Sequence, residues 1–583
     1  MPASRHPSLA AGLLAAATIA VAAVAALAGC AGGPGDIPGG AGSPRDGQGT
    51  VTATMASATP TDAATPTNSP EPTATDTPTA VPSSTPTAAP SETPTVVNLP
   101  YAARQARFAA EQTRFWGLQF SMEFDPLAYL DSITVELPRA RGAGFTSVRT
   151  TLRWEQVEPA NVAPEAFDWK AFDRKLADYS RAGFDVLVSV VEYPRWATEY
   201  RCGGSLKPGM EAEWRSFMRA AVARYSQPPY RVVAWEIGNE VDGETVVRDD
   251  DFKRPPEWGQ GEPTTPDGGC WGGRAAQYKE FLRMAYEETK AVDPGIPVTI
   301  GGLAYADVNG WFDMRFLDDL LAAGGGAYFD FLGYHWFANL KDVFPELPTG
   351  PQKHQQLADT LRRADVSKPI WLTETYRFTT AGQPESRAQQ IDFVTKELVE
   401  VVARSDVRRV YWYGWVDFPA EWSTAERGIV TNQRAPKPAF AALAYVVNYT
   451  QGVVEDISTD RVTAFRFRPP RGTGHTVIAW SRDGTPARLV VPARSNQPAR
   501  VTFFPEDMLL AGKCCGRVDV PAADGAYTLD VGGDALFVAI DREAIPGATG
   551  GLEGEAGGSV DATGGSAGAA GGTEGEVAPP GGG

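Results

Sequence analysis

The chain contains 583 residues, more than a single domain of the usual ~100–200 residues requires. Its 53 Lys and Arg stand against 71 Asp and Glu, and the resulting net charge of -18 argues against a nucleic-acid-binding surface. With only 4 histidines, a histidine-rich metal centre is also disfavoured.

The first thirty residues predict export. Residues 9–28 are apolar or small without interruption, follow Arg5, and run into Leu27-Ala28-Gly29-Cys30. Such a run is long enough to span a bilayer, and a small-residue site after it is typical of a secretory signal. The end of the run resembles the lipobox of bacterial lipoproteins, which implies cleavage before Cys30 and lipid attachment to it. We therefore expect residues 1–30 to be a lipoprotein signal peptide, with a plain transmembrane anchor as the alternative.

Either reading places the rest of the chain outside the cytoplasm, and the lipid predicts anchoring at the extracellular face of the membrane. Residues 31–98 lack aromatic residues and are rich in Thr and Pro, so they predict a disordered linker that holds the globular part off the membrane. Residues 546–583 are rich in Gly and also lack aromatic residues, which predicts a disordered tail.

Four cysteines remain after Cys30. In an oxidising compartment an even number suggests disulfides, and we predict one between Cys202 and Cys270. Cys514 and Cys515 are compatible with a vicinal disulfide or with two separate thiols.

Residues 99–450 alternate apolar runs with amphipathic helical patterns such as FDRKLADYSRAG. Strands that are apolar on both faces, separated by helices, predict a parallel sheet. Eight such units fit an α/β fold of the (β/α)₈ TIM-barrel type, with a doubly wound open sheet as the alternative. The eight runs are Trp116–Met122, Phe145–Leu152, Asp185–Val191, Arg231–Gly238, Pro297–Leu303, Phe329–Trp336, Pro369–Thr373 and Val410–Trp415.

Residues 451–545 contain short β-type runs such as RVTAFRF and HTVIAWS, split by Gly, Pro and Asp turns without helical patterns. They predict a small all-β sandwich. Trp480 is one of its few aromatic residues, so we favour a packing domain fused to the barrel over a carbohydrate-binding module.

Two of the barrel strands end in a carboxylate. The fourth run ends in Asn239-Glu240 and the seventh in Thr373-Glu374. Catalytic groups in such barrels project from the carboxyl ends of the strands. Cleavage of a glycosidic bond requires two facing carboxyl groups, one protonated and one ionised, and their mutual repulsion raises the pKa of one of them.

The motifs WEIGNE and LTE on these strands resemble glycoside hydrolase clan A, whose members are retaining (β/α)₈ enzymes. The stretches at residues 153–190 and 427–440 (RGIVTNQRAPKPAF) resemble the same clan. The resemblance covers roughly residues 112–450 and is similar for families 5, 39 and 42.

The resemblance implies a role for each matching residue. Glu240 is expected to be the acid/base and Glu374 the nucleophile. Asn239 is expected to bind the 2-hydroxyl of the sugar, and Arg149 to keep Glu374 ionised. His335 ends the sixth strand, where the clan places a His or Tyr near the catalytic pair.

The aromatic residues of the site are less determined. Trp415 or Trp412 on the eighth strand is expected to form the floor of the sugar site. Tyr334 precedes His335, whereas many clan members place a tyrosine after the sixth strand, so the role of each stays open. Trp196, Trp258 and Trp271 lie in loops and are candidate sugar platforms.

Other acidic residues near these motifs are expected to be structural. Glu236 is expected to pair with an arginine inside the barrel, and Asp249–Asp251 to form a solvated loop rather than a calcium site.

The sequence thus predicts a retaining hydrolase of β-linked oligo- or polysaccharides that works by double displacement in carbohydrate catabolism. We expect a monomer that needs no metal or organic cofactor and touches the membrane only through its lipid. A non-catalytic glycan-binding surface lipoprotein is the alternative; it would keep the tryptophans and lose a carboxylate.

Overall fold

The computed structural model describes residues 115–119, 132–200, 203–243, 271, 274–306, 312–380, 382–417, 425–469, 474–505 and 515–542. The predicted signal peptide, linker and tail lie outside these residues, as do Cys30, Cys202, Cys270, Cys514, Trp258 and Asp249–Asp251. Within the described ranges, no helix combines the length and the apolar character needed to cross a bilayer.

Eight parallel strands form one sheet in the order β7-β6-β3-β2-β1-β11-β9-β8. Parallel bridges from Thr299 to Phe331 and from Leu303 to Tyr334 join the two ends of this order, so the sheet closes into a barrel. The predicted TIM barrel is therefore confirmed, and the open sheet is wrong. Its strands are β1 (Phe115–Gln119), β2 (Ser147–Arg153), β3 (Asp185–Val191), β6 (Val232–Ile237), β7 (Val298–Ile300), β8 (Leu332–Phe337), β9 (Ile370–Tyr376) and β11 (Arg409–Tyr413).

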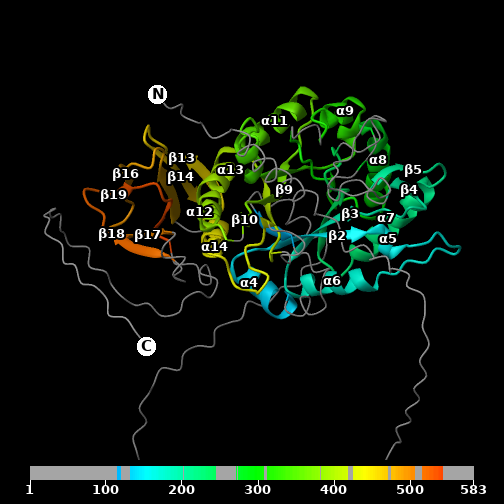
Figure 1. Cartoon of the computed structure of the whole chain (residues 1–583), viewed down its shortest axis with the longest axis horizontal. Coiled ribbons are helices and arrows are strands. Elements are labelled where there is room, and N and C mark those ends of the chain that lie inside the picture. Colours follow the sequence, from blue (N-terminus) through cyan, green and yellow to red (C-terminus); the bar gives the residue numbers. More distant parts are fainter. Residues whose placement is uncertain are drawn as a thin grey trace, which may run out of the picture. The chain divides into compact units, whose positions relative to one another are not determined.

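Helices lie around the outside of the strands, as Figure 1 shows for α6, α7, α8, α9 and α11. Their apolar residues recur at helical spacing; in α6, for example, Phe172, Leu176 and Tyr179 are buried. The described helices are α4 (Leu137–Gly142), α5 (Trp154–Val157), α6 (Lys170–Arg181), α7 (Glu211–Tyr225), α8 (Ala275–Val292), α9 (Phe316–Ala322), α10 (Ala338–Val343), α11 (Gly350–Arg363), α12 (Pro384–Asp392), α13 (Leu398–Arg404) and α14 (Ala439–Tyr449), with the π-helical turns η1 (Ser132–Glu136) and η4 (Phe393–Glu397) and the 3₁₀ turn η3 (Gly325–Ala327).

Helix α11 begins at a well-defined cap. The side chain of Thr349 accepts from the Gln352 N–H at 3.4 Å, and the Gln352 side chain accepts from the Thr349 N–H at 2.9 Å. This reciprocal pair satisfies two backbone donors that a helix start otherwise leaves unpaired. It fixes the first turn of α11, which carries Lys353.

A cluster of buried side chains from β3, β6, β9 and β11 and from the segment before β8 fills part of the barrel interior. Trp371 of β9 stacks on Phe331 with ring centroids 3.6 Å apart, and the Arg409 guanidinium lies 4.7 Å from the Trp371 ring. Leu187, Val233, Ala234 and Tyr411 complete this cluster. The interior is therefore a packed core rather than a pore, and catalytic groups in such barrels project from the carboxyl ends of the strands.

Short paired strands and a buried ion pair organise the loops above β9 and β11. The antiparallel pair β10 (Thr379–Thr380) and β12 (Ala425–Glu426) joins these loops. The Lys437 ammonium lies 2.8 Å from Asp417 Oδ1 and also donates to Thr379 Oγ1 at 3.0 Å. Burial raises the pKa of Asp417 to about 6, although Lys437 opposes that rise. A further antiparallel pair, β4 (Thr198–Tyr200) and β5 (Gly203–Leu206), follows β3.

The C-terminal part consists of two antiparallel sheets. In β16 burial alternates residue by residue, with Leu489 and Val491 inward and Val490 exposed, as a sandwich strand requires. Trp480 is 8% exposed and packs 6.0 Å from Phe465, which is the placement of a core residue. The six-stranded sheet has the order β13 (Val453–Asp456), β14 (Val462–Arg468), β15 (His475–Ser481), β20 (Leu536–Ile540), β17 (Ala499–Phe503) and β18 (Gly516–Val520), and the second sheet pairs β16 (Ala487–Pro492) with β19 (Ala526–Val531).

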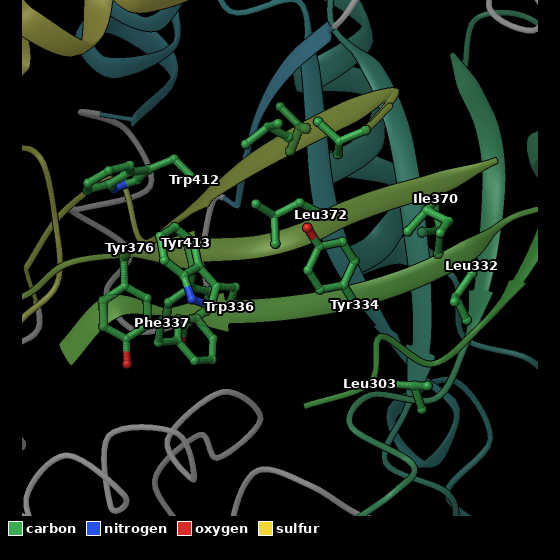
Figure 2. Close-up of a cluster of buried hydrophobic side chains, with 14 of the residues drawn as sticks. Leu303, Leu332, Tyr334, Trp336, Phe337, Ile370, Leu372, Tyr376, Trp412 and Tyr413 are labelled. Carbon is green, nitrogen blue, oxygen red and sulfur yellow. The ribbon is translucent and has the colours of Figure 1, made fainter. Parts of the chain in front are cut away.

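The barrel core predicts the effect of shortening Leu372, which is fully buried in β9 (Figure 2). Leu372→Ala should lower the free energy of unfolding by ~3 kcal/mol, because the surrounding side chains close only part of the cavity. Val490→Ala on the exposed face of β16 is the control and should change it by less than ~0.5 kcal/mol. Urea unfolding followed by circular dichroism measures both, and equal effects would contradict this account of the core.

Candidate active site

Four buried polar side chains meet at the carboxyl ends of the strands. Arg149 comes from β2, His335 from β8 and Glu374 from β9, while Glu240 follows β6 by three residues. Each is at most 1% exposed. The structure therefore brings together the residues that the sequence placed on separate strands.

Arg149 binds three of its neighbours. Its Nε donates to Glu236 Oε2 at 2.6 Å and its Nη2 to Asn239 Oδ1 at 2.7 Å, while its Nη1 donates to Glu374 Oε1. The second oxygen of Glu236 accepts the Gly302 N–H at 3.1 Å. Glu236 is thus the barrel-interior partner of an arginine, as predicted, and the same guanidinium also compensates the charge of Glu374.

His335 lies between the two predicted catalytic carboxylates. Its Nδ1 is 2.9 Å from Glu240 Oε1 and 3.8 Å from Glu374 Oε2. Burial lowers the pKa of His335 well below its usual value, and the charges of Arg149 and Lys353 lower it further. The imidazole is therefore neutral at physiological pH: it hydrogen-bonds Glu240 and lies near Glu374 without bonding it.

The environment of Glu240 favours a protonated carboxyl group. Burial raises its pKa well above the usual value, and the negative charges of Glu374 and Asp242 raise it further, against the opposing effect of Arg149 and Lys353. Its Oε2 has no hydrogen-bond partner among the described residues. A buried carboxyl group that keeps its proton and has an unengaged oxygen is suited to proton donation.

The backbone at Glu240 is held in an uncommon conformation. Its φ of 44° lies in the left-handed region, which costs a non-glycine residue energy and is found where the surroundings enforce it. The Glu240 N–H donates to the Gly302 carbonyl at 2.9 Å, and Ser189 Oγ donates to the Gly238 carbonyl at 2.9 Å. These bonds to the segment after β7 and to β3 fix the direction in which the carboxyl group points.

Close packing around His335 depends on Gly302. A Cβ added there would lie 2.3 Å from His335 Nε2 and 2.6 Å from Thr373 Oγ1. Only a residue without a side chain leaves space for the imidazole.

Two charged residues of the site were missed from the sequence. Asp242 accepts the N–H groups of Ala304 at 3.0 Å and Tyr305 at 2.7 Å, and burial raises its pKa to about 6. Lys353 of α11 donates to the Ala304 carbonyl, and burial lowers its pKa to about 8. Asp242 could have been noticed because it closes the same motif as Glu240, two residues later.

Three aromatic side chains of the site were also not predicted from the sequence. Phe337, Tyr376 and Tyr413 end strands β8, β9 and β11, with ring centroids 4.5 Å apart for the first pair and 5.7 Å for the second (Figure 2). Phe337 lies 6.0 Å from the His335 ring, and the Arg427 guanidinium lies 6.0 Å from the Tyr376 ring. We name Phe337, Tyr376 and Tyr413 the aromatic trio; it lies beside the carboxylate pair.

The tryptophans of the eighth strand do not form the expected floor of the site. The Trp412 ring lies 6.0 Å from Phe393 of η4, in the layer between strands and helices. Trp415 packs against Phe145 and Phe440, and its indole N–H donates to Glu136 Oε2 at 2.5 Å. Both are buried core residues. Alternation along β11 directs Tyr411 and Tyr413 inward and Trp412 outward, whereas Trp415 follows the end of β11.

The loop tryptophans and Tyr334 also take structural positions. Trp271 packs against Tyr278 and Phe281 in the core, which contradicts its prediction as a platform. The Trp196 indole donates to the Glu158 carbonyl at 3.1 Å, and its sugar-binding role stays a prediction. Tyr334 lies 5.8 Å from the His354 ring, so in β8 it is His335 that faces the carboxylates.

Within the described part of the chain, His, Cys, Asp and Glu side chains form no group of three or more that could hold a metal ion.

Comparison with known proteins places the fold. No protein-family profile matches the chain, and no curated protein matches its sequence. Among solved structures, a family 39 glycoside hydrolase from the gut symbiont Bacteroides cellulosilyticus WH2 is 16% identical, with a TM-score of 0.52 over 74% of this chain and 81% of the other. A glucosidase from Croceicoccus marinus is 14% identical, and the catalytic domain of a family 30 xylanase C from Talaromyces cellulolyticus is 12% identical; each has a TM-score of 0.50 over 73% of this chain and 96% of its own.

The resemblance to clan A glycosidases is thus confirmed at the level of the fold: the chain is built on the barrel that these glycoside hydrolases share.

The packing at Gly302 gives a prediction that does not depend on any activity. Gly302→Ala should lower the free energy of unfolding by ~1–3 kcal/mol, because the added carbon overlaps His335 and Thr373. Gly142→Ala is the control, since nothing lies within 4 Å of its added carbon, and it should be neutral. Urea unfolding compares the two, and equal stability of both variants would contradict the tight packing around His335.

Proposed function

We propose that the protein is a retaining glycoside hydrolase that cleaves β-linked oligo- or polysaccharides by double displacement. The observation that carries the proposal is the position of His335 Nδ1, 2.9 Å from Glu240 and 3.8 Å from Glu374. Glu240 Oε1 and Glu374 Oε2 are therefore at most 6.7 Å apart. This bound includes the ~5–5.5 Å separation of retaining enzymes and reaches only the lower edge of the ~6.5–9.5 Å range of inverting ones.

In the first step Glu374 attacks the anomeric carbon while Glu240 gives its proton to the departing glycosidic oxygen. The bond from the anomeric carbon to that oxygen breaks as the bond to Glu374 forms. Arg149 compensates the charge of Glu374, and the unengaged Oε2 of Glu240 supports its role as the acid. In the second step Glu240 takes a proton from water, which displaces Glu374 and restores the β-configuration.

Two groups are suited to hold the sugar. Asn239 is fixed by Arg149 through its amide oxygen, so its NH₂ group is turned to another side and can donate to the 2-hydroxyl. The aromatic trio presents ring faces and edges beside the carboxylates, and sugars pack their C–H faces on such rings. The reaction requires no metal or organic cofactor.

We further propose that the enzyme acts at the outer face of the cell membrane as a monomer. The support is in the sequence alone: the apolar run that ends in Cys30, and the Thr/Pro-rich segment at residues 31–98. Palmitate labelling of the wild type, and its loss in Cys30→Ala, is the expected result.

An activity panel tests the proposed reaction. Wild-type protein should hydrolyse at least one aryl β-glycoside, and Glu374→Gln should lose that activity because no nucleophile remains. Glu240→Gln should be ~10²–10⁴-fold slower on poor leaving groups, and azide should restore turnover with activated substrates by giving a β-glycosyl azide. Glu280→Gln on the surface of α8 is the matched control and should keep full activity.

Either of two results would refute the reaction. Hydrolysis that survives in Glu374→Gln would remove the nucleophile assignment. A wild type that binds a β-glycan without cleaving any substrate would instead favour the glycan-binding alternative.

The pH profile tests the acid. Because Glu240 must carry its proton, kcat/KM should fall as pH rises through the raised pKa of Glu240, well above the usual range of a carboxyl group. This basic limb should vanish in Glu240→Gln when an activated substrate is used. A limb that persists unchanged in that variant would assign the proton to another residue.

A further inference from the structure

Two buried, oppositely charged residues, Asp242 and Lys353, bind the loop that also binds the Glu240 backbone, and neither has a role in the proposed reaction. Asp242 is 1% exposed and the Lys353 side chain 4% exposed. Asp242 follows Glu240 by two residues, whereas Lys353 comes from α11, a helix on the outside of the barrel. Burying charges is costly unless they are paired and hydrogen-bonded, so their placement requires an explanation.

One loop connects both residues to Glu240. The Gly302 carbonyl accepts the Glu240 N–H, and two residues later the Ala304 carbonyl accepts from Lys353 Nζ. The Ala304 and Tyr305 N–H groups donate to the two oxygens of Asp242. Residues 302–305, which follow β7, therefore bind the backbone of Glu240, the carboxylate of Asp242 and the ammonium of Lys353.

The loop is held in a conformation that needs these bonds. Tyr305 has a φ of 42°, in the left-handed region that a bulky residue seldom adopts. The two oxygens of Asp242 bind consecutive N–H groups at this turn, and Lys353 reaches it from the capped first turn of α11. A helix outside the barrel thereby fixes a turn at the catalytic end.

We propose that Lys353 and Asp242 are positioning residues that act on Glu240 as an opposed pair of charges, Lys353 favouring the ionised base and Asp242 the protonated acid. This inference rests on the proposed function, in which Glu240 must be an acid in the first step and a base in the second. If a charge of one sign alone lay near an acid/base residue, it would shift the pKa of that residue and strongly favour either the protonated or the ionised form. The opposed pair keeps both forms accessible.

The other charges that face Glu240 are already engaged. Arg149 binds Glu236, Glu374 and Asn239, and Glu374 is the neighbour whose charge disappears when the glycosyl-enzyme forms. His335 is neutral and contributes a hydrogen bond. Lys353 and Asp242, like Arg149, keep their charge through both steps, and they are the two of these three that bind the loop at residues 302–305.

The kinetic test relies on the opposite effects that Lys353 and Asp242 are expected to have on the pKa of Glu240. Lys353→Met removes a positive charge and should move the basic limb of kcat/KM up by about one pH unit, whereas Asp242→Asn should move it down by a similar amount. Lys353→Arg should restore the wild-type limb. Lys175→Met is the matched control, because Lys175 also lies on an outer helix and donates to a strand carbonyl, that of Thr151 at 3.0 Å; its profile should not move.

A double-mutant cycle of unfolding free energies tests the pair independently of catalytic activity. In urea unfolding of the full chain, Lys353→Met and Asp242→Asn should be non-additive at pH 7, where Asp242 with a pKa of about 6 and Lys353 with a pKa of about 8 are both mainly charged. Below pH 5 Asp242 is protonated and the effects should become additive.

The outcomes separate the two proposals. If the limbs of both variants move in the same direction, or if Lys353→Arg shifts the limb as far as Lys353→Met, the opposed-charge role is overturned. Additivity at pH 7 would show that Lys353 and Asp242 do not act as a coupled pair, whether or not the protein is active. If the wild type cleaves no glycoside, the proposed function fails by itself, and the unfolding cycle alone decides whether the charges are coupled.

Discussion

The polar end of the barrel depends on a single buried guanidinium. Arg149 cannot lose its charge, so at 1% exposure it must have anionic or strongly polar partners. It binds Glu236, Glu374 and Asn239 through its three nitrogens, and these residues come from strands on two other sides of the barrel. Each of these side chains is thereby held in one place by a charge that water does not screen.

This constraint explains how two neighbouring glutamates come to have different surroundings. Glu374 accepts a hydrogen bond from the charged Arg149, whereas Glu240 is hydrogen-bonded to His335, which is neutral. Glu240 is also turned by a left-handed backbone toward a region that contains Asp242 and Glu374. In the proposed function the same residue type serves as the acid at one strand end and as the nucleophile at another, because the surroundings of the two glutamates differ.

The sequence predicted the strands and their carboxylates for a simple physical reason. A strand buried on both faces reads as a short apolar run, and a glutamate at its end is conspicuous, as Glu240 and Glu374 are. The expected sugar-site floor at Trp412 or Trp415 was not found, because the composition of a strand does not tell which of its faces a residue occupies. In β11 the alternation turns Trp412 outward, and a left-handed turn at Gly414 (φ 78°) leads Trp415 into the core. Lys353 could not be found, because α11 reads as a polar surface helix and only the fold shows that its first turn reaches Ala304.

The position of Arg149 in the chain also bears on how the barrel assembles. Glu236, Glu240, Asp242 and Glu374 all come from the segment between β6 and β9, while Arg149 comes from β2 in the first quarter of the barrel. A half-barrel made of the later strands alone would lack the guanidinium that binds Glu236 and Glu374. Burying these two carboxylates before Arg149 is in place would leave them without their cation, which is costly. The polar centre therefore couples the two halves of the barrel and makes its closure a cooperative event, in which the late strands gain a stable interior only by docking onto the early ones.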